Sequence, residues 1–209
     1  DLHFNSHVNA TEYELELKVH FLQLVEFIDR NGDGVPNAGE EVQSIDLTQK
    51  AYSSPTVNQT TSTDGKAGYR FESHLTGETY VFQIIGDIFT TNAVLNDTFV
   101  KPTEMKITIV IEDFPYKENG SLALMIETTS EKQEHMIEGT GDIEEDVTVQ
   151  SATAEGYFSW SKEALIDGVS KEVRSSVANT ENGKLIALSY PNGKDMVHDP
   201  KLGISLLAN

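Results

Sequence analysis

The sequence contains no cysteine among its 209 residues. This absence excludes a disulfide framework, a cysteine-based metal site and a cysteine nucleophile. Basic residues are also scarce, with 15 Lys and Arg against 34 Asp and Glu, which gives a formal net charge of −19. Because a surface of this sign repels nucleic acid and anionic lipid, we expect neither as a partner.

Long apolar runs and catalytic motifs are missing as well. No apolar run approaches the roughly 18 residues of a membrane-spanning helix, so we expect no membrane span. Neither a Gly-x-Ser-x-Gly elbow nor a phosphate-binding glycine loop is present. Glu144, Glu145 and Asp146 are adjacent on a polar stretch, whereas a glycosidase holds two carboxyl groups about 5–10 Å apart across the bond. We therefore do not expect an enzyme, although a secreted hydrolase or lyase with an unrecognised site is left as a third alternative.

What the sequence has in abundance is alternation of apolar and polar residues. Residues 12–21 and 105–112 alternate with a period of two, which is typical of half-buried strands. Turn signals such as Asn119-Gly120, Asp167-Gly168 and Asn182-Gly183 separate about a dozen such segments. We predict an all-β fold, a β-sandwich of one large or two small sub-domains.

Composition also divides the chain. An N-terminal β-region is predicted over residues 1–130, and the polar, acidic residues 131–146 are interpreted as a linker or long loop. Residues 147–209 form a C-terminal β-region, which either stands apart or belongs to the same sandwich.

One polar stretch, residues 29–40, has the spacing of a calcium-binding loop. Side-chain oxygens occupy positions 1, 3, 5, 9 and 12, a glycine occupies position 6 and a backbone carbonyl occupies position 7. The predicted metal ligands are Asp29, Asn31, Asp33, the carbonyl of Val35, Asn37 and Glu40. Such an all-oxygen set suits Ca²⁺, which is the predicted cofactor. The alternative is a turn that is held by Asx side-chain hydrogen bonds alone.

This stretch resembles the calcium loop of EF-hands and the Asp-x-Asn-x-Asp-Gly loops of secreted β-modules. Residues 21–28, which precede it, also fit the helical spacing found before an EF-hand loop. The segment nevertheless continues the period-two pattern without a helix N-cap, and its phase slips at Leu22 and Gln23. We predict a calcium loop between two strands.

Three further features bear on the source of the chain. The stretch from Gly156 to Lys201 resembles cell-surface proteins of archaea and protists that have no assigned activity. Asn-x-Ser/Thr sequons, which are acceptors for N-linked glycans, occur at Asn9, Asn58, Asn96 and Asn119. The sequence starts at Asp1 rather than Met, which we interpret as a processed or truncated N-terminus. These features favour a secreted or cell-surface glycoprotein.

The segments at both ends of the chain, Leu2–Val8 and Leu202–Leu206, have strand patterns and no adjoining hairpin partner. A strand with an unpaired edge can complete the sheet of a neighbouring copy, which builds a filament. We therefore expect an extracellular structural protein, a calcium-stabilised subunit of a surface layer or filament that assembles by strand donation. The alternative is a secreted module that binds carbohydrate or another surface ligand. In both cases the partners are copies of the chain or glycans.

Overall fold

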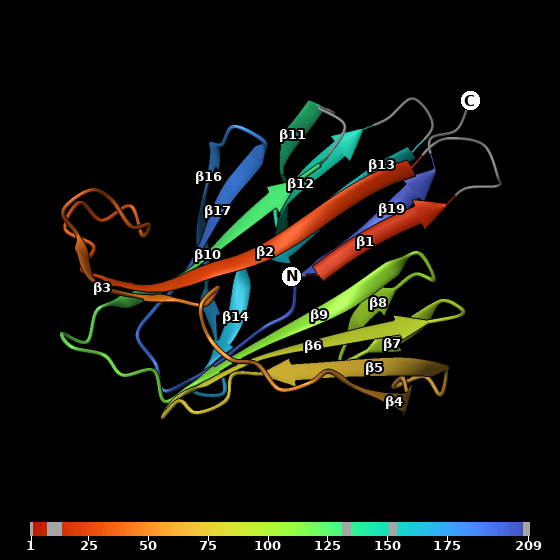
Figure 1. Cartoon of the computed structure of the whole chain (residues 1–209), viewed down its shortest axis with the longest axis horizontal. Helices are drawn as coiled ribbons and strands as arrows, with labels where there is room; N and C mark the ends of the chain where they lie inside the picture. The colour runs from red at the N-terminus through yellow and green to blue at the C-terminus, as the bar shows by residue number, and fades with distance from the viewer. Residues whose placement is uncertain (1, 8–13, 131–134, 151–153, 207–209) are drawn as a thin grey trace.

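The long alternating segments of the sequence form the central strands of two antiparallel sheets, which pack face to face (Figure 1). The computed structural model describes residues 2–7, 14–130, 135–150 and 154–206. Every element in these ranges is a strand, and the predicted β-sandwich is confirmed. Among the described residues, no helix is long and apolar enough to cross a membrane.

The six-stranded sheet has the order β1-β2-β10-β17-β16, and β3 also pairs with β2. Its strands are β1 (Leu2–His7), β2 (Glu14–Phe27), β3 (Glu41–Asp46), β10 (Ser121–Thr129), β16 (Arg174–Asn179) and β17 (Gly183–Tyr190). The central strand β2 is long enough to take two partners on its outer edge, β1 along its first half and β3 along its second half.

The second sheet has eleven strands, in the order β11-β12-β13-β19-β9-β18-β14-β15, with β6, β5 and β4 added in turn on the other edge of β9. Its strands are β4 (Thr56–Thr61), β5 (Ala67–His74), β6 (Val81–Phe89), β9 (Glu104–Glu112), β11 (His135–Thr140), β12 (Glu144–Gln150), β13 (Ala154–Ser161), β14 (Glu163–Ile166), β15 (Val169–Glu172), β18 (Asp195–His198) and β19 (Lys201–Leu206). A small separate hairpin consists of β7 (Ala93–Leu95) and β8 (Thr98–Val100).

The phase slip at Leu22 is a β-bulge in β2. On β10, Met125 pairs with Gln23 and the next residue pairs with Phe21, so Leu22 has no partner on that strand. A bulge inserts one residue and turns the following side chains to the opposite face. This is why Leu17 and Val19 before the bulge and Leu24 after it all reach the core. The segment that also fitted helical spacing is therefore a bulged strand.

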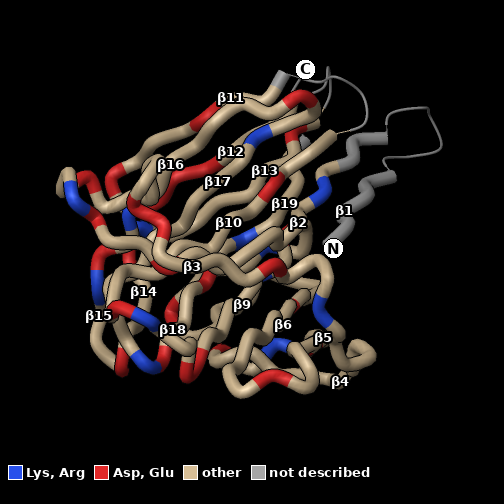
Figure 2. Tube along the Cα trace, turned by 60° about the vertical axis from the view of Figure 1, so that its left-hand side comes forward, with Lys and Arg blue, Asp and Glu red and all other residues tan. Residues whose placement is uncertain are grey.

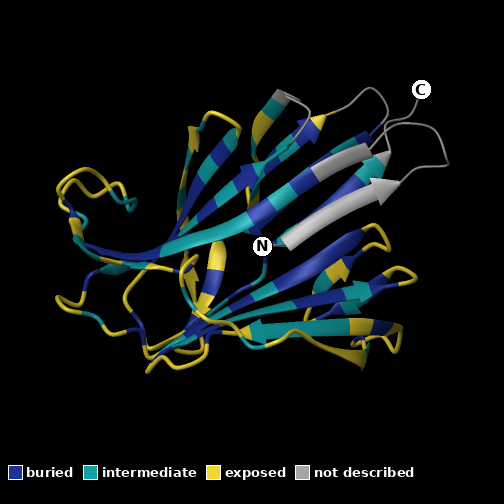
Figure 3. Ribbon diagram, viewed as in Figure 1, coloured by how far each residue is buried: buried dark blue, intermediate teal, exposed yellow. Residues whose placement is uncertain are grey.

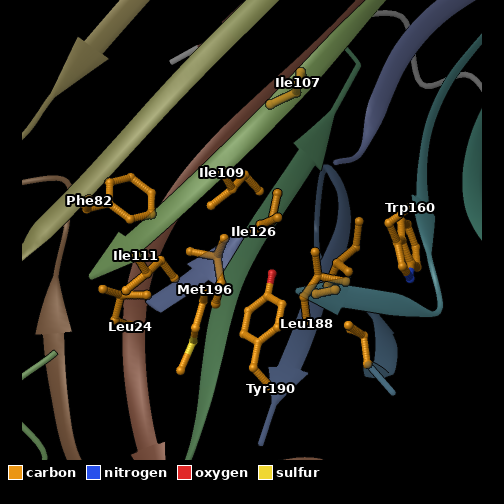
Figure 4. Packing of buried hydrophobic residues seen from close by; sticks show 14 of the residues in the cluster. Leu24, Phe82, Ile107, Ile109, Ile111, Ile126, Trp160, Leu188, Tyr190 and Met196 are labelled. Carbon is orange, nitrogen blue, oxygen red and sulfur yellow. The ribbon is translucent and has the colours of Figure 1, made fainter. Parts of the chain in front are cut away.

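One large apolar cluster fills the space between the sheets, and Figure 4 shows part of it. Buried residues lie along the strands of both sheets (Figure 3). Ile107, Ile109 and Ile111 of β9 face Leu24, Ile126 and Leu188 of the other sheet. Each buried aliphatic or aromatic side chain contributes roughly 1.5–3 kcal/mol relative to its exposed state. Residues of the N-terminal and the C-terminal predicted regions belong to this one cluster.

The stretch 131–146, interpreted from its acidity as a linker or long loop, contains strands. Residues 135–140 form β11 and residues 144–150 form β12, which pair with each other. β12 also pairs with β13 and sends Val147 and Val149 into buried positions. Burial of these two alternating valines therefore explains why the acidic stretch ends in a strand. The acidic side chains belong to the first residues of β12, which are more exposed than the valines.

The connection from β9 to β10 crosses between the sheets, although the turn signal Asn119-Gly120 indicates a hairpin. The carboxylate of Glu26, which is fully buried, holds this connection. It accepts backbone hydrogen bonds from Lys117 at 2.8 Å, Glu118 at 2.8 Å and Gly120 at 3.2 Å, and one from the Gln43 amide at 2.7 Å. A side chain of the six-stranded sheet thus fixes the place where the chain enters that sheet.

Candidate calcium loop

The predicted calcium loop lies between β2 and β3, where the chain leaves the six-stranded sheet and returns to it. The backbone N–H of Ile28 donates to the carbonyl of Glu40 at 2.9 Å, which closes the base of the loop. β2 and β3 pair antiparallel, so the two ends of the loop are held beside each other. The strands thereby supply a fixed base for residues 29–40.

Asp29, the first predicted ligand, binds the backbone of its own loop. Its two carboxylate oxygens accept hydrogen bonds from the N–H groups of Gly32 at 2.8 Å and Gly34 at 3.0 Å. Gly34 has a φ of +80°, a backbone conformation that other residues adopt only with strain. The turn that the spacing predicts at position 6 is present.

Asp33 is the centre of the side-chain network. Its carboxylate accepts from the amide nitrogen of Asn31 at 2.8 Å, from that of Asn37 at 2.9 Å and from the backbone N–H of Val35 at 3.0 Å. The same Asn37 nitrogen lies 3.0 Å from the carbonyl oxygen of Val35. Four of the six predicted ligands, Asp33 included, therefore meet at the Asp33 carboxylate.

Glu40, the twelfth position, is buried and ties the end of the loop to its beginning. Its carboxylate accepts hydrogen bonds from the backbone N–H of Arg30 at 2.9 Å and of Asn37 at 3.1 Å. All six residues predicted from the spacing thus lie in one closed turn.

The hydrogen bonds from the backbone also stabilise the charged form of these acids. The Val35 N–H, followed by the Asn37 amide, lowers the pKa of Asp33 below its ordinary value. For Glu40, the N–H of Arg30 is the main cause of a lowered pKa. Both carboxylates are therefore kept in the ionised state that a metal ligand needs.

The donor set fits a hard cation in its chemistry. It comprises the carboxylates of Asp29, Asp33 and Glu40, the amide oxygens of Asn31 and Asn37 and the Val35 carbonyl, all oxygen ligands. Among the described residues, no group of three or more Asp, Glu, His or Cys side chains converges as a metal cluster. To coordinate an ion, the Asn37 amide has to turn its oxygen toward the position that its nitrogen now faces, a rotation by half a turn.

Gly34 also connects the loop to the far edge of the sheet. A Cβ atom added to Gly34 would come within 2.6 Å of Cγ of Arg174, the first residue of β16. The loop therefore rests on the aliphatic stem of Arg174, whose guanidinium is 3.0 Å from Glu172. This contact supports the turn from outside the predicted ligand set.

The predicted glycan acceptors lie in different settings. Asn96 and Asn119 are exposed and have positive φ angles of 49° and 51°, in tight turns. Asn58 lies within the edge strand β4, not in the loop that the polar sequence predicts, but it is exposed there. Asn9 lies outside the described residues.

Sequence reasoning missed a set of buried charges on the outer side of the eleven-stranded sheet. The Lys106 ammonium, 1% exposed, donates to Asp199 at 2.5 Å, and Arg70 forms a two-pronged ion pair with Asp87 at 2.8 and 3.0 Å. Asp87 is the cross-strand partner of both Arg70 and Lys106. The period-two pattern of the sequence indicates only which face of the sheet these charged side chains occupy. It does not show that this face is covered.

Comparison of the chain with known protein families and with curated proteins gives no match.

Proposed function

We propose that the chain is an extracellular structural subunit that binds Ca²⁺ at residues 29–40 and assembles into a surface layer or filament by exchange of its first strand. The observation that carries this proposal is the position of β1. It lies at the edge of the six-stranded sheet and pairs antiparallel with β2, from Leu2 with Val19 to His7 with Glu14.

This edge pairing is one that a neighbour can supply. Among the described residues β1 pairs with β2, the next strand in sequence, so the adjoining partner that its sequence did not indicate is present within its own chain. The other terminal segment, β19, pairs on both edges, with β13 and β9, so β1 is the terminal strand that an exchange would use. If β1 of a second copy takes the same place, every backbone hydrogen bond of the pair is kept. The exchange therefore costs no pairing energy, and a head-to-tail exchange builds an open filament where its rotation does not close into a ring.

The composition of β1 supports an exchange. Leu2–His7 contains no Lys, Arg, Asp or Glu and no proline. Natural sheets usually protect their edges with charge, proline or a bulge. β4, at an edge of the other sheet, is uncharged as well, so this chain of net charge −19 leaves edge strands of both sheets without that protection.

The rest of the chain supports a location outside the cell. A loop of hard oxygen ligands is useful where free Ca²⁺ is abundant, and the sequons at Asn58, Asn96 and Asn119 are exposed. Acidic residues are spread over both sheets rather than confined to the loop, as Figure 2 shows. A bound cation would reduce the repulsion within a surface of this charge.

Deletion of residues 1–9 tests the assembly. The full chain is expected to form polymers that sediment rapidly and are visible as filaments by electron microscopy. The truncated chain is expected to fold with a lower melting temperature and to stay monomeric. Addition of a peptide with the sequence Asp1–Asn9 should restore the melting temperature, because the peptide refills the edge of β2.

The proposal fails if the full chain remains monomeric at every concentration with Ca²⁺ present. It also fails if the truncated chain still forms the same polymers. A peptide of the same composition in scrambled order is the control for the rescue.

A further inference from the structure

A cleft of about 600 Å³ opens between the two sheets, beside the segment that connects β3 to β4. Phe21 of the six-stranded sheet lines one wall, Phe71, Phe82 and Ile84 of the eleven-stranded sheet line the other, and Lys50 and Tyr52 of the connecting segment lie at the mouth. This volume is in the range of roughly 300–1,000 Å³ that is usual for small-ligand sites. It shares no residue with the calcium loop.

The inner wall of the cleft is aromatic and is shaped by a glycine. Phe71 and Gly86 are cross-strand partners, and a Cβ atom at position 86 would lie 2.7 Å from the Phe71 ring. The missing side chain therefore lets this ring lie against β6. Phe21 and Phe82 meet edge to face, with ring centroids 6.0 Å apart. Phe82 itself is fully buried, so the aromatic surface on which a flat or slightly puckered ring can stack is that of the half-buried Phe21 and Phe71.

The mouth of the cleft is polar, and its hydrogen-bonding groups are positioned by bonds within the chain. Lys50 donates to Glu78 at 2.7 Å and keeps two further N–H donors. Ser73 Oγ donates to the carbonyl of Ser53 at 3.0 Å, which leaves the Ser73 oxygen free to accept. Hydrogen-bond donors and acceptors therefore both lie at the edge of the aromatic surface.

Tyr52 completes the mouth. An isolated β-bridge to Leu75 fixes its backbone, while its side chain is 39% exposed. Burial of its hydroxyl end raises the pKa of Tyr52 to about 12, so the group stays neutral and can both donate and accept. The tyrosine therefore presents a ring and a hydroxyl to anything that enters.

We propose that this cleft binds a neutral saccharide ring. A pyranose has apolar C–H faces that stack on aromatic rings and a rim of hydroxyls that both donate and accept hydrogen bonds. Lys50, which lines the cleft, is neutralised by Glu78 in an ion pair, and Glu72, which also lines the cleft, adds a carboxylate that can accept hydrogen bonds from sugar hydroxyls. An uncharged ligand suits that pair, whereas an anionic ligand is repelled by a chain of net charge −19. This site does not depend on exchange of β1.

Saturation-transfer NMR on the full chain tests the site with the methyl glycosides of glucose, galactose, mannose and N-acetylglucosamine. At least one glycoside is expected to receive saturation, most strongly on the ring C–H protons that stack. Tyr52→Ala is expected to weaken that binding about fivefold or more, since an aromatic contact is lost from an exposed position. Phe99→Ala removes another exposed aromatic ring, 50% exposed on β8 and outside the cleft, and should bind as the parent does.

The proposal is overturned if none of the four glycosides receives saturation. It is also overturned if the uncharged apolar dye Nile red binds at the Tyr52 site while the glycosides do not compete, because the cleft is then an apolar pocket. Equal glycoside binding by the parent, Tyr52→Ala and Lys50→Ala would place the sugar elsewhere. Far-UV circular dichroism of each variant verifies that its fold is retained.

Discussion

Tyr190 of the six-stranded sheet and His198 of the eleven-stranded sheet are joined by a hydrogen bond across the core, with Tyr190 Oη 3.0 Å from His198 Nδ1. His198 Nε2 lies 2.9 Å from the carbonyl oxygen of Ser161. Because a carbonyl only accepts, Nε2 carries the proton and Nδ1 accepts from the tyrosine hydroxyl. The two sheets are thus connected through a neutral histidine, and both side chains are fully buried.

This histidine predicts a loss of stability in mild acid. Burial lowers the pKa of His198 from 6.5 to about 4. The unfolded chain therefore binds a proton at a higher pH than the folded chain, and stability falls as the pH drops from 6.5 toward 4. Between pH 7.5 and pH 5.0 we expect this group to cost about 2 kcal/mol of unfolding free energy.

Urea unfolding at these two pH values measures the effect. His198→Phe should lose that part of the pH dependence, whereas His74→Gln, at an exposed position, should retain it. An unchanged pH dependence in His198→Phe would show that another group is responsible.

The buried carboxylate of Glu26 leads to a second prediction, a different dependence of stability on pH. Burial disfavours the charged form of Glu26 and by itself raises the pKa. The four hydrogen bonds that the carboxylate accepts outweigh burial and lower the pKa of Glu26. Glu26 therefore stabilises the folded chain above pH 4.5, the ordinary pKa of glutamate, and this stabilisation is lost as the pH falls below that value. Glu26→Gln places an NH₂ group against backbone donors and should cost about 1–3 kcal/mol at pH 7.

Urea unfolding of Glu26→Gln at pH 7 provides this measurement. Glu118→Gln is the matched control, since it removes the same charge from an exposed position in the same connection. Equal stability of the two variants would mean that the Glu26 carboxylate does not anchor the crossing between the sheets.

Calcium binding predicts a rise in melting temperature. An ion that binds only the folded loop stabilises the chain in proportion to ln(1 + [Ca²⁺]/Kd), which is about 2.7 kcal/mol at a hundredfold excess over Kd. Differential scanning fluorimetry across a Ca²⁺ series, against an EDTA reference, measures this rise. Asp33→Ala should abolish it.

Asp142→Ala, at an exposed position outside the loop, has the same change of charge and should respond to Ca²⁺ as the parent does. If added Ca²⁺ leaves the melting temperature of the parent unchanged, residues 29–40 are a turn that is held by its own side chains.

Glycosylation predicts a mass above that of the bare chain. Material from the native source should exceed 23.1 kDa, and peptide mapping should find glycans on at least two of Asn9, Asn58, Asn96 and Asn119. Enzymatic removal of N-glycans should then return the mass to that of the chain. An intact mass equal to the bare chain would contradict the prediction and weaken the case for secretion.

The sequence alone determined the fold class and the local geometry of the loop. Alternation in residues 12–21 and 105–112 reports which face of a strand is buried, and the spacing from Asp29 to Glu40 is a short-range property of one turn. Even the bulge at Leu22 is visible, because an inserted residue shifts the phase of the alternation. Each of these signals depends on neighbours in the chain.

Only the tertiary structure decided which strands pair and which polar groups are buried. The strand within residues 56–61 consists of polar residues apart from Val57 and lies at a sheet edge, where no apolar alternation is needed. Glu26 follows Leu24 and Val25 as a lone acid in an apolar run, yet its partners come from residues about 90 positions later. The cleft likewise joins Phe21 to Phe71 and Phe82 from the opposite sheet. Such contacts depend on how two sheets stack, and no short-range pattern in the sequence encodes them.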